Sequence, residues 1–140
     1  MKTQYNVLTG NNVTLQWSVT GSGFTGIVWS IKPSSTAVNI WSARPDGSYD
    51  GTVTPPAAYK DRLSSTFDGS IISLIIKDLK LTDSNNYYCT LNSLAGDVTS
   101  SKMTLNVYGK LQTSYLIELY CRSNCPINFV NESLYDVEDE

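Results

Sequence analysis

Residues 74–89 read LIIKDLKLTDSNNYYC, and their pattern is the strongest indication of the fold. Apolar side chains occupy every second position around both of its ends, namely Ile72, Leu74 and Ile76 on one side and Tyr87, Cys89 and Leu91 on the other. Because successive side chains of a β-strand point to opposite faces, each run predicts a strand with one buried face. The polar residues between the two runs predict a connecting turn.

The same alternation recurs elsewhere between residues 4 and 108. Three further runs place apolar residues at every second position, namely Val13 to Val19, Ile27 to Ile31 and Met103 to Val107. Clusters of Gly, Ser, Pro and Asp separate the runs and are typical of turns. No segment keeps a long helical period. The sequence therefore predicts an all-β sandwich of two antiparallel sheets.

The composition excludes several classes of protein. The chain has 140 residues, with 10 Lys and Arg against 13 Asp and Glu, so it lacks the basic excess that is typical of nucleic-acid binding. It has no His, the commonest general base and metal ligand. No phosphate-binding loop and no nucleophile with an adjacent base can be assembled from the sequence. We therefore predict no enzyme activity, no cofactor and no metal site.

The charge is unevenly distributed along the chain. Residues 1–108 hold 8 basic and 7 acidic side chains, whereas residues 109–140 hold 2 basic and 6 acidic ones. We predict a first domain over 1–108 and a C-terminal segment over 109–140. The segment is either the start of a following membrane-proximal region or a strand added to the first domain, and its tail is acidic. Thirty-two residues are too few to bury an independent core without cross-links.

The pattern Leu74-x-Ile76-x-x-Leu79-x-x-x-Asp83-x-x-x-Tyr87-x-Cys89 resembles strands E and F of an immunoglobulin variable-type (V-set) domain. The motif Gly10-x-x-Val13-x-Leu15-x-Trp17 is similar to the entry into strand B. The resemblance covers about residues 4–108.

The resemblance implies structural roles for several residues. Trp29 matches the core tryptophan of strand C, and Tyr87, two residues before Cys89, matches the tyrosine corner. Arg62 lies 21 positions before Asp83, the separation at which V-set domains place a salt bridge across the base of the sandwich.

The sequence departs from the family at the inter-sheet disulfide. Trp17 stands 12 positions before Trp29, where antibody-like domains have the strand-B cysteine, so Cys89 has no inter-sheet partner within the first part. We expect Trp17 to fill this volume beside Trp29 and Cys89. Cys89 is then a buried, inert thiol, or it pairs with Cys121 or Cys125. For these two, a local disulfide or paired thiols fits better than a zinc site.

A second departure narrows the resemblance. Residues 98–102 lack the Phe/Trp-Gly-x-Gly motif of antigen-receptor variable domains, so the chain is more similar to non-rearranging cell-surface V-set domains. The Trp at the strand-B position resembles invertebrate surface receptors, including the allorecognition proteins of colonial cnidarians. This resemblance implies the ectodomain of a plasma-membrane protein. Two sequons, at Asn12 and Asn131, are compatible with an extracellular glycoprotein.

The resemblance and the strand alternation together predict a recognition module. We expect it to bind another protein, including a second copy of itself, through the face formed by strands C, C′, F and G. The predicted contact residues point away from Trp29 and Cys89, and they are Val28, Ser30, Lys32, Trp41, Tyr88, Thr90, Asn92, Lys102, Thr104 and Asn106. Trp41 is on this face if Ile40 points inward. Otherwise it covers the sheet edge or packs under the loop 43–56.

An alternative prediction is a binder of glycans or other non-self ligands. The contacts would then come from the loops 21–26 and 92–97, whose Gly and Asn residues are typical of exposed turns. The strand-F arginine of sialic-acid-binding V-set domains is missing from residues 87–92.

Overall fold

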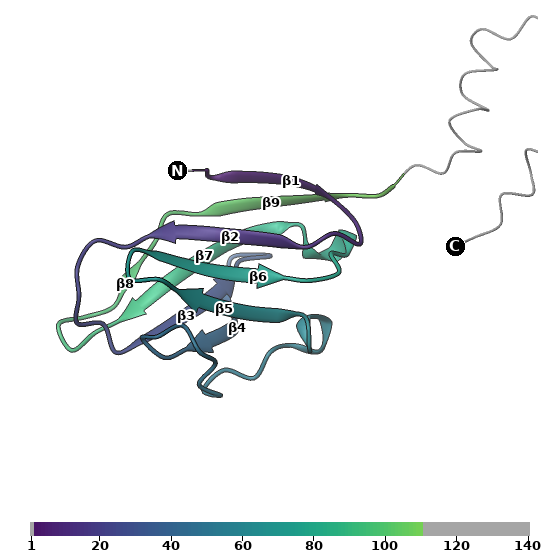
Figure 1. Ribbon diagram of the computed structural model, residues 1–140. Coiled ribbons are helices and arrows are strands. Elements are labelled where there is room, and N and C mark those ends of the chain that lie inside the picture. The colour runs from purple at the N-terminus through teal and green to yellow at the C-terminus, as the bar shows by residue number, and fades with distance from the viewer. Residues whose placement is uncertain (1, 111–140) are drawn as a thin grey trace, which may run out of the picture. The chain divides into compact units, whose positions relative to one another are not determined.

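A computed structural model describes residues 2–110, which form two β-sheets stacked on each other (Figure 1). The larger sheet has six strands and the smaller one three. Within this range the helical turns are the two short 3-10 helices η1 (Ala57–Tyr59) and η2 (Leu81–Asp83). The predicted all-β sandwich is therefore confirmed.

The six-stranded sheet follows the order β1-β9-β7-β3-β4, and β8 pairs with β7 beyond the end of β9. Its strands are β1 (Gln4–Leu8), β3 (Gly26–Ile31), β4 (Val38–Ala43), β7 (Asn85–Asn92), β8 (Val98–Thr99) and β9 (Met103–Tyr108). All its pairings are antiparallel except that of β1 with β9. This parallel pair places β1 at one edge of the sheet.

The three-stranded sheet follows the order β2-β6-β5 and is antiparallel throughout. Its strands are β2 (Val13–Ser18), β5 (Leu63–Phe67) and β6 (Ile71–Ile76). In β2 every second residue is buried, and the residues between are exposed. The sequence alternation thus decides which face of this strand packs against the larger sheet.

The core lies between the two sheets. It contains the three residues found where related domains have the inter-sheet disulfide. Trp17 comes from β2, whereas Trp29 and Cys89 lie directly opposite each other on β3 and β7. All three belong to one buried cluster, and each is at most 3% exposed. Within residues 2–110 Cys89 forms no disulfide, because this range contains no second cysteine. Cys121 and Cys125, and the pairing predicted for them, lie outside the described residues.

The two core tryptophans carry an energetic cost. The indole nitrogens of Trp17 and Trp29 are buried and have no hydrogen-bond partner in the described part of the chain. A buried donor without a partner costs about 1–3 kcal/mol, because it loses water and gains nothing in exchange. The apolar area of the rings must therefore outweigh this loss.

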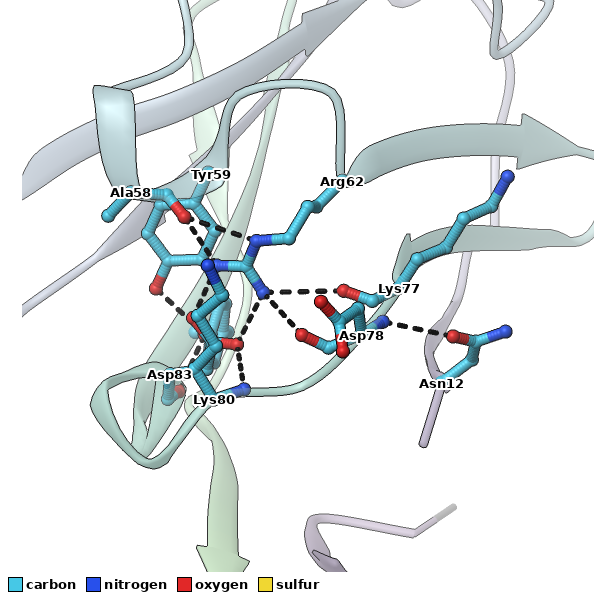
Figure 2. A network of polar contacts seen from close by, with 9 residues as sticks. Asn12, Ala58, Tyr59, Arg62, Lys77, Asp78, Lys80 and Asp83 are labelled. Carbon is cyan, nitrogen blue, oxygen red and sulfur yellow. Dashed lines mark hydrogen bonds and ion pairs between the residues drawn. The ribbon is translucent and has the colours of Figure 1, made fainter. Parts of the chain in front are cut away.

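A polar network closes one end of the sandwich (Figure 2). The Arg62 guanidinium donates to both carboxylate oxygens of Asp83, at 2.7 and 2.9 Å. It also donates to the carbonyl oxygens of Ala58, Lys77 and Asp78. The backbone N–H of Lys80 donates to the same carboxylate at 2.8 Å. The Arg62 and Asp83 side chains are only 10% and 1% exposed, so both charges depend on these contacts.

Tyr87 extends this network into the core. Its hydroxyl donates to the carbonyl oxygen of Asp83 at 2.7 Å, as a tyrosine corner does. The Tyr59 hydroxyl lies 2.9 Å from that of Tyr87. Because the single Tyr87 proton is used on Asp83, Tyr59 is the donor in this pair. Burial raises the pKa of both phenols, so the two hydroxyls stay neutral.

The first domain's strands all lie between residues 4 and 108. Of the C-terminal segment 109–140, only Gly109 and Lys110 are described. The predicted boundary and the two alternatives for this segment therefore stay predictions.

We predict that Arg62→Ala lowers the free energy of unfolding by about 3 kcal/mol, because it leaves Asp83 buried without its countercharge. Urea titration followed by circular dichroism measures this change. Lys77→Ala is the control, since the Lys77 side chain is exposed and only backbone atoms of Lys77 take part in the network. Equal stability of Arg62→Ala and the wild type would contradict a supporting role for the ion pair.

We predict that Cys89 reacts with an alkylating reagent only after unfolding, since burial raises the pKa of its thiol to about 12. The unfolded thiol ionises near pH 8.5, so above that pH the unfolded state binds fewer protons than the native state. The contribution of this group to stability therefore falls as the pH rises from about 8.5 to about 12. Peptide mass spectrometry after labelling locates the modified cysteine.

The control for the pH dependence is Cys89→Val, which has no thiol to titrate and should lose this part of the alkaline slope. Rapid labelling of Cys89 in the folded protein at pH 8 would contradict the prediction.

Candidate partner-binding face

The candidate site is the outer face of the six-stranded sheet, which we define as the side chains of β1, β3, β7 and β9 that point away from the three-stranded sheet. The pairing of Trp29 with Cys89 places both of these side chains inward. The neighbouring pairs, Val28 with Thr90 and Ser30 with Tyr88, therefore point outward.

The predicted contact residues differ in how much surface they present. Lys32 and Lys102 are exposed, and they lie just after β3 and just before β9. A half-buried group includes Val28, Tyr88, Thr90, Asn92, Thr104 and Asn106. Ser30 is only 8% exposed, so it offers little surface to a partner.

Side-chain hydrogen bonds order the polar part of the outer face. The Asn106 amide donates to the Asn6 oxygen at 3.0 Å, and the Thr104 hydroxyl donates to Asn86 at 2.9 Å. A further contact of 2.9 Å joins the hydroxyls of Thr90 and Thr99. These bonds run between neighbouring strands, so they restrict the rotamers of the short polar side chains.

Several polar groups on the outer face remain available to a partner. Within residues 2–110, the Tyr88 hydroxyl and the ammonium groups of Lys32 and Lys102 take part in no hydrogen bond or ion pair. None of the six strands of this sheet contains Asp or Glu. The outer face is therefore neutral to basic, with Tyr88 on its middle strand.

The prediction that Trp41 is exposed on this face is wrong. Its premise holds, since Ile40 is fully buried, but the ladder between β3 and β4 has a register shift after Trp29. Trp41 pairs with Trp29 while Asn39 pairs with Ser30, so Ile40 is an extra residue. Such a bulge places consecutive side chains on the same side of the strand.

Trp41 instead covers the edge of the core, as the alternative prediction proposed. Its indole N–H donates to the hydroxyl of Ser65 on β5 at 2.8 Å, which joins the two sheets. Its ring stacks on Tyr49 of the loop 43–56, with centroids 4.2 Å apart. Tyr49 is 41% exposed and its hydroxyl donates to the Val53 carbonyl. The sequence reasoning missed this aromatic residue because no alternation marks a position in a loop.

The two loops of the alternative prediction lie next to each other. The backbone N–H of Thr25 donates to the carbonyl of Asn92 at 2.7 Å, which joins the ends of the loops 21–26 and 92–97. Leu94 in the second loop is 99% exposed. An apolar side chain with this exposure is available for contact.

Two features of the described residues bear on metal binding and on nucleophilic chemistry. The described residues contain no cluster of acidic or Cys side chains that could hold a metal ion. A groove of about 300 Å³ lies beside Trp17 and Cys89, but the raised pKa of Cys89 makes its thiol a poor nucleophile there. The other residues that line it have no titratable side chain, and they are Ser18, Val19, Thr20, Leu91, Val98, Ser100 and Ser101.

Comparison with known proteins agrees with this architecture. A family model described as the immunoglobulin V-set domain matches residues 2–108, which include all nine strands. No curated protein matches the chain.

We predict that Trp41→Ala lowers the free energy of unfolding by about 2 kcal/mol, less than the 3–5 kcal/mol typical of a fully buried aromatic residue, because the ring is half-buried. Trp41→Phe retains an aromatic ring but loses the bond to Ser65, so its expected loss is about 1 kcal/mol. Denaturant titration distinguishes the two. An unchanged stability in Trp41→Ala would show that the ring does not support the core.

Proposed function

Because this chain belongs to the immunoglobulin V-set family, we propose that it is a recognition module that binds another protein through the outer face. V-set domains are generally binding modules, are typically not enzymes and are commonly extracellular. The proposal adds a particular surface to this general role.

The observation that carries the proposal is the position of Tyr88. It lies on β7, the third strand in the order β1-β9-β7-β3-β4, and its hydroxyl has no partner within the described residues. Tyrosine is enriched among the residues that dominate binding energy, because it combines a large apolar ring with one polar group. A half-buried Tyr near the middle of a sheet therefore suits the centre of an interface.

The polar side chains of the outer face are held in place by hydrogen bonds, and this supports the same face as the binding surface. The bonds between Asn6 and Asn106 and between Thr104 and Asn86 hold these groups in place before any partner arrives. Immobilising a free side chain on binding costs about 0.5–1.5 kcal/mol, so an ordered face binds at a lower entropic cost.

The charges bear on the nature of the partner. Two copies that met through this face would bring together Lys32 and Lys102 from both, and the strands supply no carboxylate to pair with them. Such a contact is isologous, so each unfavourable pair occurs twice. Self-recognition through this face is therefore weak and strengthens when salt screens the lysines, whereas binding to an acidic protein weakens with salt.

A second candidate function is glycan binding through the loops 21–26 and 92–97, and the hydrogen bond that joins the two loops favours it. A glycan array tests this candidate directly. Under the protein-binding proposal, no glycan should bind in a way that depends on these loops.

We also propose that the domain acts outside the cell, as part of the ectodomain of a membrane-anchored protein. The support is the common extracellular location of V-set domains. In the described part of the chain, no helix has the length and apolar character needed to cross a bilayer.

We predict that Tyr88→Glu abolishes aggregation of beads that carry the full chain, while its melting temperature stays close to that of the wild type. A carboxylate buried in an interface loses its hydration, whereas on the free face it stays solvated. Bead aggregation by light scattering measures binding, and circular dichroism measures melting.

Leu94→Glu is the matched control, because it places the same charge on an exposed loop residue. If Leu94→Glu abolishes aggregation and Tyr88→Glu does not, the binding site lies in the loops and not on the outer face. Wild-type beads that stay dispersed at both low and high salt would exclude a second copy as the partner.

A further inference from the structure

Asn12 lies in the turn between β1 and β2 and begins the sequon Asn12-Val13-Thr14. Asn12 and Thr14 are exposed, whereas Val13 between them is 6% exposed and belongs to the core cluster. The buried valine fixes the backbone at this point. Both polar side chains of the sequon therefore face water at a defined position.

The Asn12 side chain is held by its oxygen alone. The backbone N–H of Asp78 donates to Asn12 Oδ1 at 3.0 Å, and Figure 2 shows this contact with the amide nitrogen on the far side. Two backbone bonds, from Gly10 to Leu79 and from Leu79 to Asn11, fix the same two segments against each other. Because an N–H requires an acceptor, the orientation of the amide is determined, and Nδ2 is the atom that has no partner within residues 2–110.

We propose that Asn12 is a site of N-glycosylation and that the fold is built to carry the sugar there. In this transfer Nδ2 attacks the anomeric carbon of a lipid-diphosphate-linked oligosaccharide. The new Nδ2–C1 bond replaces the C1–O bond to the diphosphate, the lipid diphosphate leaves, and Nδ2 gives up one proton. No oxidant or reductant is needed.

The folded domain accommodates the product without losing a contact. Glycosylation leaves the Oδ1 lone pairs free, so the hydrogen bond from Asp78 is retained. It also leaves one hydrogen on Nδ2. Because Asn12 is exposed, no core residue has to move to make room for the sugar.

The position of Asn12 keeps a glycan away from the loops at the other end of the sandwich. The adjacent Thr9 donates its N–H to the carbonyl of Tyr108, so this turn lies where β9 ends. Figure 1 shows the β1–β2 turn at that end and the β2–β3 connection at the opposite one. Asn12 also leads into β2, a strand of the three-stranded sheet. The outer face of the six-stranded sheet is left open.

The test is secretion of the full chain from eukaryotic cells behind an added signal peptide, in an Asn131→Gln background that removes the second sequon. Peptide mass spectrometry, before and after an enzyme that removes N-glycans, determines the occupancy of Asn12. Thr14→Ser keeps the sequon, and Thr14→Ala destroys it without touching the bond between Asn12 and Asp78. Thr14 is exposed, so both variants should fold.

We expect the wild-type sequon and Thr14→Ser to carry a glycan at Asn12, and Thr14→Ala to lose it completely. The enzyme converts the glycosylated Asn12 to Asp, which keeps an acceptor oxygen, so the treated protein should melt close to the untreated one. An unmodified Asn12 peptide in the secreted wild type would overturn the proposal. A glycan that remains at Asn12 in Thr14→Ala would equally reject the sequon as its cause.

Discussion

The buried ion pair between Arg62 and Asp83 fixes the end of the sandwich at which the two sheets are joined. A buried charge is costly unless it is paired and hydrogen-bonded, and here the Asp83 carboxylate accepts from Arg62 twice and from Lys80 once. The Asp83 carbonyl also accepts the Tyr87 hydroxyl. One residue thus connects the residue before β5, the 3-10 turn η2 and β7, so that both sheets meet at a fixed point. The arrangement works as a unit, since removing either charge leaves the other buried and unpaired.

That fixed point matters because no cross-link joins the sheets through Cys89 within the described residues. A disulfide that closes so long a loop contributes about 4 kcal/mol in the chain-entropy estimate. Trp17 supplies buried area in the same place, but its indole N–H has no partner, and neither has that of Trp29. The burial of Trp17 therefore replaces only part of the stabilisation that a disulfide would give. Trp41 adds a second link between the sheets, because its indole N–H reaches Ser65 on β5.

The strands and the core could be predicted from the sequence because a half-buried strand repeats every two residues. The inward positions of β2, β3 and β9 follow that period, and so do Tyr87 and Cys89 on β7. Trp41 could not be placed in this way, because the bulge at Ile40 interrupts the period. The bulge is visible only in the pairing of β4 with β3. The parallel pairing of β1 with β9 was also missed, since it depends on residues about 100 positions apart and leaves no local pattern. Tyr49 lies in a loop and has no period to follow.

The same period explains how one strand can serve both the fold and a partner. Tyr87 and Tyr88 are neighbours in the chain, yet Tyr87 is fully buried in the network around Asp83 and Tyr88 lies on the outer face. Their side chains point to opposite sides of the sheet, so the two rings face different surroundings. The outer face of β7 can therefore change its side chains to suit a partner while the inner face keeps the two sheets together.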